Sequence, residues 1–174
     1  MEEKIPSAGK SALYYGLVLG VALVVISLIL YLVEQQKEVA GIVIGSVALI
    51  AGIVMVQLDY RNKKCGGYIT YGKAVKIAFL TMIFAGIIVA SYTYVYHSYI
   101  NTNDLLETKT EKIQDIYNKG YDAATEEQAI KYIEMSTTPL TSAIGVVIFY
   151  PILGVIIALI SSIFIKKEEH VSLS

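Results

Sequence analysis

Charged residues are scarce in this chain, and cysteine is almost absent. Of the 174 residues, 17% are charged and 55% are hydrophobic. A soluble domain of this length normally carries more charge than that. The single cysteine, Cys65, excludes an internal disulfide and fits a reducing compartment. The composition therefore argues against a soluble or disulfide-stabilised domain.

Four long apolar segments account for the hydrophobic excess. The one charged residue inside them is Lys76, close to the start of the third. A helix rising about 1.5 Å per residue crosses a hydrocarbon layer of ~30 Å in about 20 residues. In lipid each backbone N–H must be paired inside its own segment, so these segments should be helices. We predict an all-α integral membrane protein, a single membrane domain over residues 1–174, with transmembrane helices at 11–33, 39–58, 74–100 and 138–165.

Basic residues predict how these helices are oriented. Short loops rich in lysine and arginine resist translocation and stay in the cytoplasm. Eight such residues fall on one predicted side: Lys4, Lys10, Arg61, Lys63, Lys64, Lys73, Lys166 and Lys167. The first loop on the other side has only Lys37. We therefore expect a multi-pass protein of the bacterial inner membrane with both termini in the cytoplasm.

The segment 101–137 differs from the rest of the chain because it is polar and acidic. Its eight acidic residues outnumber four lysines. Asn103 is a candidate cap for a helix that ends at Gly120, and Thr125 with Gln128 forms a candidate capping box for a second helix. We predict an extracytoplasmic helical hairpin, either resting on the bundle or offering a docking surface. The acidic residues lack metal-ligand spacing, so we expect no metal site.

The stretch from Gly67 to Lys73 reads G-x-x-x-x-G-K, one residue short of a phosphate-binding P-loop. The position that would hold magnesium is Ala74, and no strand is predicted before the glycines. We therefore expect no nucleotide, no nucleic acid and no cofactor to bind. The stretch is better explained as a membrane-surface turn at Gly66 and Gly67. The neighbouring basic residues would contact lipid headgroups: Arg61, Lys63, Lys64, Lys73 and Lys76.

The same stretch also resembles a known family. GGYITYGKAVKIAF, residues 66–79, is similar to a signature in an uncharacterised group of bacterial four-helix membrane proteins, the domain-of-unknown-function family four-one-nine-nine. The likeness extends to the layout of two helices, a basic GG loop, a third helix, an outward polar segment and a fourth helix. The resemblance implies a bacterial inner-membrane protein without an established activity, and it supplies no catalytic residue.

Small residues predict how the helices pack. Lipid tails are as apolar as leucine, so transmembrane helices associate where small residues allow close approach. The candidate packing positions are Gly16, Gly20, Gly41, Gly45, Gly52, Gly86, Gly154 and Ala158. They either pack one four-helix monomer, which we favour, or form a homodimer seam on the first or second helix. Pro151 should kink the fourth helix, as a static bend or as a hinge.

Ionisable residues are missing from the centres of the predicted spans, where ion relays of transporters usually lie. Gln57 and Asp59 stand at the inner edge, and His97 lies among outer tyrosines in a predicted interfacial position. We find no catalytic constellation. We predict a small non-enzymatic accessory protein whose partners are membrane lipids and either itself or another membrane protein. The alternative is a small oligomeric transporter or channel that uses Pro151.

Overall fold

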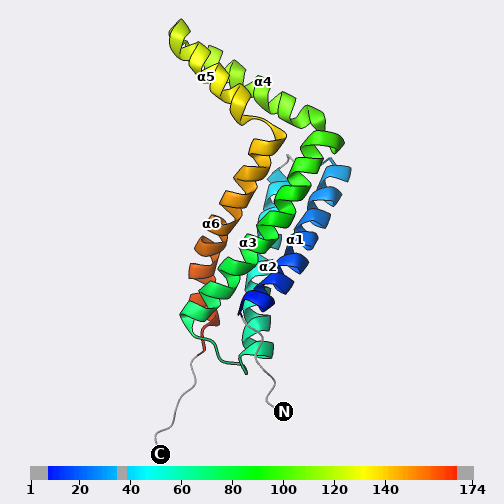
Figure 1. Cartoon of the computed structure of the whole chain (residues 1–174), viewed down its shortest axis with the longest axis vertical. Helices are drawn as coiled ribbons and strands as arrows, with labels where there is room; N and C mark the ends of the chain where they lie inside the picture. Colours follow the sequence, from blue (N-terminus) through cyan, green and yellow to red (C-terminus); the bar gives the residue numbers. More distant parts are fainter. Residues whose placement is uncertain (1–7, 35–38, 168–174) are drawn as a thin grey trace, which may run out of the picture. The chain divides into compact units, whose positions relative to one another are not determined.

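A computed structural model describes residues 8–34 and 39–167, so Lys4, Lys37 and His170 lie outside the described residues. This part of the chain forms α-helices and one short π-helix, with no β-strand (Figure 1). Four helices are long and apolar enough to cross a membrane, which confirms the all-α prediction with four candidate membrane spans. The elements are α1 (Ala8–Leu32), α2 (Val39–Lys64), α3 (Tyr71–Val95), η1 (Tyr96–Ile100), α4 (Thr102–Lys119), α5 (Ala123–Ser136) and α6 (Pro139–Ile165).

The helices extend beyond the apolar segments that predicted them. α2 continues to Lys64 rather than ending at 58, and α3 begins at Tyr71 rather than at 74. Membrane thickness sets the length of the apolar segment but does not end the helix. The last turn of α2 carries Arg61, Lys63 and Lys64, whose charges favour the partly negative C-terminal end of a helix.

The chain forms two compact units. The first comprises residues 1–89 and 148–174, and the second comprises residues 90–147. α3 and α6 contribute to both.

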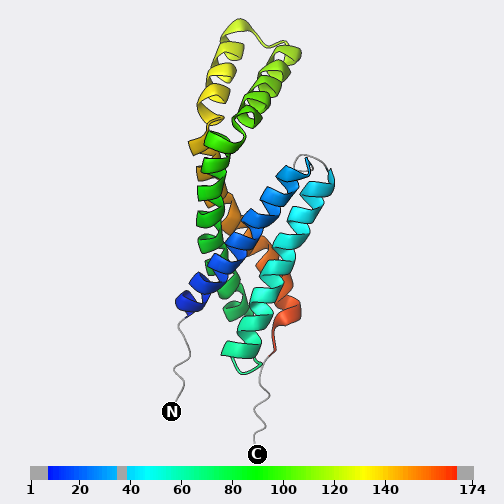
Figure 2. The same ribbon diagram turned by 90° about the vertical axis from the view of Figure 1, so that its right-hand side faces the viewer.

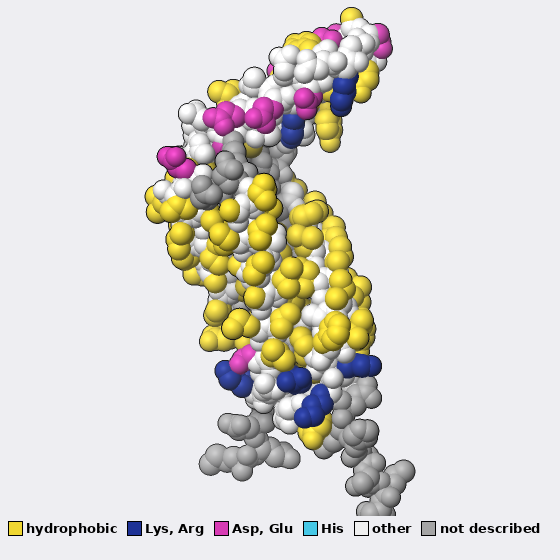
Figure 3. Space-filling view, turned by 180° about the vertical axis from the view of Figure 1, so that it is seen from behind, with side chains coloured by type: hydrophobic (Ala, Val, Ile, Leu, Met, Phe, Trp, Pro, Cys, Tyr) yellow, Lys and Arg dark blue, Asp and Glu magenta, His cyan; other side chains and the backbone are white. Residues whose placement is uncertain are grey.

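The core of the first unit draws on four helices. α1 and α2 lie side by side in both ribbon views (Figure 2). One cluster of buried side chains joins α1, α2, α3, the α2–α3 loop and the last residue of α6: Ala12, Tyr15, Val56, Tyr60, Ile69, Ala74, Ile77 and Ile165. Hydrophobic side chains also cover the outside of the spans, and lysine and arginine gather at the end where α2 joins α3 (Figure 3). An apolar outer surface of this kind is what a lipid-facing bundle requires.

The α2–α3 loop is pinned to the end of α6. Gly66 and Gly67 adopt positive φ angles of 62° and 87°, a conformation that favours glycine, and they reverse the chain. Ile69 N–H then donates to Lys167 O at 2.8 Å, and Lys167 N–H donates back to Ile69 O at 3.0 Å. This isolated antiparallel bridge holds the loop against the residues that follow α6.

In the second unit α4 and α5 form an antiparallel hairpin (Figure 2). α4 ends at Gly120, which has the left-handed conformation expected of a helix-terminating glycine (φ 63°). α4 begins at Thr102 without a side-chain cap, so the predicted cap at Asn103 is wrong. The predicted capping box at Thr125 is also wrong, because the cap of α5 is Asp122, three residues earlier.

The Asp122 carboxylate accepts hydrogen bonds from Thr125 N–H at 3.1 Å and from the Thr125 hydroxyl at 2.7 Å. These bonds stabilise the charged carboxylate and lower the pKa of Asp122 below its ordinary value. Asp122 is a better cap than Thr125 because its carboxylate can accept two hydrogen bonds at once. α6 begins at Pro139, and the Thr138 hydroxyl accepts from Thr141 N–H at 3.2 Å, as a cap before a first-turn proline should.

The small residues proposed for packing differ in their surroundings. A Cβ added at Gly16 would lie 2.9 Å from the Thr81 carbonyl of α3, and one at Gly20 would lie 3.0 Å from Ile88 Cβ. Gly154 has Met82 Cβ 2.7 Å from the same position. Gly52 faces the side chain of Leu19 on α1, Gly41 and Gly86 are buried, and Ala158 is fully buried. Gly45, by contrast, has open space around it.

This contrast yields a matched pair of variants. Gly16→Ala places a methyl group against a backbone carbonyl of α3 that cannot easily retreat, so we expect a loss of about 1–3 kcal/mol in the free energy of unfolding. Gly45→Ala adds the same methyl group in open space and should be neutral or slightly stabilising. Denaturant titration of the purified protein in mild detergent, followed by circular dichroism, measures both. Equal shifts in the two variants would contradict the packing described here.

Candidate functional site

A buried amide joins three helices near one end of the first unit. Gln57 on α2 is fully buried. Its Nε2 donates to the Ala74 carbonyl of α3 at 3.2 Å and to the Ser162 hydroxyl of α6 at 2.9 Å. Its Oε1 accepts from the Ser161 hydroxyl at 2.7 Å. We call Gln57, Ala74, Ser161 and Ser162 the Gln57 network.

Every polar group of the Gln57 amide has a partner, so the network is well suited to fastening helices together. A neutral amide with two hydroxyls has no ordinary acid–base function near neutral pH. Hydrogen bonds between transmembrane helices each contribute about 0.6 kcal/mol, and at most about 2. From the sequence, Gln57 was predicted only to lie at the inner edge of the second span. The sequence feature that could have indicated the network is an uncharged polar residue in the second span, Gln57, together with the Ser161–Ser162 pair in the fourth.

A second set of contacts surrounds Asp59, two residues further along α2. The Tyr15 hydroxyl of α1 donates to Asp59 Oδ2 at 2.7 Å, and Lys63 forms an ion pair with the same carboxylate. Arg61 points elsewhere, with Nη1 donating to the Ile165 carbonyl at 3.1 Å. Two of the five residues predicted to contact lipid headgroups therefore have protein partners. Lys73 and Lys76 are exposed and Lys64 is half-buried; lipid contact by these residues stays a prediction.

In the second unit, α3 ends in a π-helical turn that presents a histidine to an acid. His97 Nδ1 lies 3.5 Å from Asp104 Oδ2, and both side chains are largely buried. The Tyr96 ring packs edge-on against the imidazole, and Asn101 Nδ2 donates to the Tyr96 hydroxyl at 2.9 Å. π-helical turns often occur at functional sites. Here the imidazole–carboxylate pair is too small to be a metal centre: within residues 8–34 and 39–167, no three metal-ligating side chains cluster.

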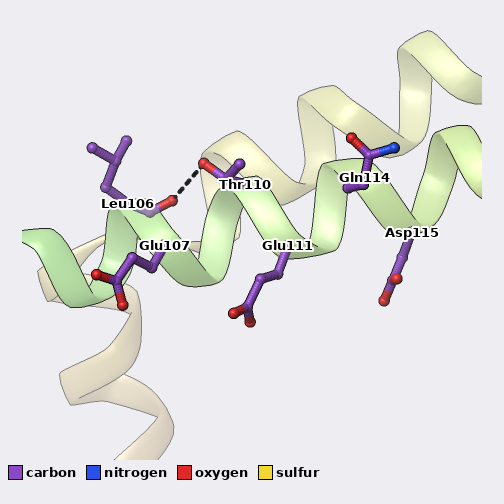
Figure 4. A pocket seen from close by; sticks show the side chains of 6 residues that line it. All are labelled: Leu106, Glu107, Thr110, Glu111, Gln114 and Asp115. Atoms are coloured by element: carbon purple, nitrogen blue, oxygen red, sulfur yellow. Dashed lines mark hydrogen bonds between the residues drawn. The ribbon is translucent and has the colours of Figure 1, made fainter.

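The hairpin carries one shallow hollow on each helix. The hollow on α4 has a volume of about 580 Å³, and Figure 4 shows the six side chains that line it. A carboxylate row lies along one edge and a less polar row along the other, because residues four apart share a face of a helix. The rows are Glu107, Glu111 and Asp115, and Leu106, Thr110 and Gln114. The hollow on α5, about 480 Å³, is lined by Ala123, Glu126, Glu127, Ile130, Lys131 and Glu134.

Large apolar and aromatic side chains of the hairpin are exposed as well. Ile133 is the one buried residue of α4 and α5. Tyr132 is 73% exposed and Met135 is 68% exposed. Leu106, Tyr117 and Tyr121 are also exposed. The hairpin therefore offers contact surface without a core of its own. The sequence indicated a partial apolar face here but could not show that it would be left uncovered.

The near P-loop does not have the surroundings of a phosphate site. α2 is helical up to Lys64, and the described residues between it and α3 contain one isolated bridge instead of a strand. Gly72 and Lys73 already belong to the first turn of α3. A P-loop needs a buried strand before the glycines. The arrangement here supports a turn.

Pro151 lies inside α6, which continues through it from Pro139 to Ile165. Proline has no N–H, so the Val147 carbonyl lacks its usual partner four residues along the helix. Both interpretations of Pro151, a static bend and a hinge, stay open.

The Gln57 network can be tested by removing its central amide. Gln57→Ala would leave the Ser161 and Ser162 hydroxyls without their partner and open a small void, so we expect a loss of about 2 kcal/mol in the free energy of unfolding. Ser46→Ala removes an exposed hydroxyl that bonds only to its own helix, at the Ile42 carbonyl, and serves as the control. Denaturant titration in detergent measures both variants. Equal stability of Gln57→Ala and the wild type would show that the network does not hold the helices.

Comparison with known proteins identifies the family and nothing more specific. No curated protein and no solved structure matches the chain. One family model does match, across most of the described residues, and it confirms the resemblance suggested by residues 66–79 and by the order of the helices. The chain belongs to the family described as protein of unknown function (DUF4199), whose model covers residues 14–167.

Proposed function

We propose that this multi-pass membrane protein is a non-enzymatic accessory protein that binds another membrane protein through the α4–α5 hairpin. The observation that carries this proposal is the surface of that hairpin: Tyr132 and Met135 are exposed, and Ile133 alone is buried. The hairpin would face the extracytoplasmic side of a bacterial inner membrane, with both termini in the cytoplasm.

The composition of the hairpin surface fits a protein-binding role. Tyrosine and methionine are enriched at the centres of protein interfaces, where they supply contact area. Around them lie the carboxylates of both hollows, which would form a polar rim. The excess of acidic residues over lysines in 101–137 would repel anionic headgroups. These charges favour a partner protein over the lipid surface as the occupant.

A non-enzymatic role is supported by the polar groups inside the spans. The Gln57 network uses its amide on helix contacts. Asp59 is neutralised by Lys63. His97 faces Asp104, and a single imidazole–carboxylate pair does not constitute a catalytic site without a nucleophile or a bound substrate.

The alternative function, a small oligomeric transporter or channel, rests on Pro151 inside α6. If Pro151 is a hinge for transport, Pro151→Ala should reduce solute flux in proteoliposomes. If the accessory role is right, this replacement should leave partner capture unchanged.

Photo-crosslinking tests the hairpin directly. A photoreactive amino acid in place of Tyr132 should give one discrete crosslinked protein in native membranes, because this side chain is 73% exposed on the hairpin. The control is the same group in place of Phe164, which is 81% exposed on a span and should react mainly with lipid. The double variant Tyr132→Ala/Met135→Ala should reduce co-purification of the captured protein at least tenfold. Crosslinks that are the same at both positions would contradict the proposal.

The orientation can be tested with the single cysteine. A membrane-impermeant maleimide should fail to label Cys65 in intact cells and should label it after permeabilisation, because the basic α2–α3 loop is proposed to be cytoplasmic. Glu126→Cys in a Cys65→Ser background places the thiol on the hairpin and should be labelled in intact cells. Labelling of Cys65 in intact cells would reverse the orientation and the side on which the hairpin lies.

A further inference from the structure

We propose that Arg61, Lys166 and Lys167, together with the Tyr68 ring, bind the phosphate headgroup of an anionic phospholipid. We call these four residues the inner basic cluster. All of them belong to the first unit. The proposal stands independently of any partner bound by the hairpin.

One backbone bridge and two side-chain contacts bring the residues of the cluster together. Two hydrogen bonds join Ile69 to Lys167, at 2.8 and 3.0 Å, and fix the α2–α3 loop beside the end of α6. Lys167 Nζ lies 5.3 Å from the centre of the Tyr68 ring. Arg61 Nη1 donates to the Ile165 carbonyl at 3.1 Å, which brings the guanidinium next to the start of the lysine pair. Three positive charges from two distant parts of the chain are therefore neighbours.

These charges have no carboxylate partner in the part of the chain that the structure describes. Arg61, Lys166 and Lys167 form no ion pair there, and both lysines are exposed. Asp59, the acid of the same end of α2, is bound by Lys63 and by the Tyr15 hydroxyl. Glu168 and Glu169 follow in the sequence but lie outside the described residues. Like charges held close together repel one another, so an external anion would stabilise the cluster.

The surface beside the cluster points to a lipid as the source of the anion. Ile163 and Phe164, in the last turn of α6, are 57% and 81% exposed, and only the buried Ile165 separates them from the two lysines. A phospholipid would place its phosphate at the lysines and Arg61 and its acyl chains along these apolar side chains. Tyr68 is an amphipathic ring of the kind that prefers the headgroup level. Free phosphate would contact only the basic residues and would leave Ile163 and Phe164 without a contact.

The inner basic cluster differs from the lipid contacts predicted from the sequence. That prediction grouped five basic residues by their position before or within the third span. The structure keeps Arg61, pairs the exposed Lys63 with Asp59, and adds Lys166 and Lys167 from the other end of the chain.

Native mass spectrometry of the full-length protein in detergent tests the proposal. The probes are phosphatidylglycerol, phosphatidylcholine and soluble glycerol 3-phosphate. The wild type should bind phosphatidylglycerol more tightly than phosphatidylcholine. Lys166→Gln/Lys167→Gln should weaken phosphatidylglycerol binding by about 10- to 30-fold, since each lysine near an anionic lipid surface contributes about 1 kcal/mol.

The matched control is Lys112→Gln/Lys119→Gln, which removes the same charge from exposed positions on α4 and should leave phosphatidylglycerol binding unchanged. Equal loss in the two double variants would overturn the proposal, because it would reduce the effect to net charge. Equal binding of both phospholipids by the wild type would overturn it as well. Displacement of phosphatidylglycerol by equimolar glycerol 3-phosphate would assign the cluster to a soluble phosphate and overturn the lipid assignment.

Discussion

Inside a hydrocarbon layer backbone polar groups must find their partners within the protein, and the architecture follows from that requirement. Helices satisfy the backbone within each segment, apart from the Val147 carbonyl opposite Pro151, which is why four apolar segments become α1, α2, α3 and α6. The same rule applies to the Gln57 side chain, which is buried where three helices meet. Its amide finds partners on α3 and α6. The Gln57 network thus specifies a register between helices whose apolar surfaces alone would allow many registers.

Close packing supplies the other part of this specificity. Gly16 and Gly20 let α1 approach α3, and Gly154 lets α6 approach Met82 of α3. Each contact depends on which side chain stands opposite the glycine, whereas the contact of leucine with lipid does not depend on a particular neighbour. α3 is approached by α1 and α6 through glycines and by α2 through Gln57, so it is the central helix of the first unit.

The sequence was sufficient to predict features that depend on local composition. It indicated the four spans, the helical hairpin and the glycine that ends α4, because length, hydropathy and a left-handed φ are local properties. It failed where two local solutions compete, as at Asp122 and Thr125, since both residues can cap a helix and the geometry of the turn decides. It also could not distinguish Gly45 from Gly16. The difference between these glycines lies in what stands opposite, which depends on tertiary register. The pairing of Gln57 with Ser161 and Ser162 could not be predicted either, because it also depends on tertiary register.

The position of these two serines has a consequence for how the protein is made. α2 enters the membrane long before α6 has been synthesised, so during that interval the Gln57 amide lacks its hydroxyl partners. Once α3 is in place the amide already donates to the Ala74 carbonyl, but Oε1 and the second N–H bond still await Ser161 and Ser162 of α6, and unsatisfied polar groups in an apolar surrounding are costly. Arrival of the fourth span then brings both Ser161 and Ser162 to Gln57 and Lys167 to Ile69, so completion of the chain and closure of the bundle coincide.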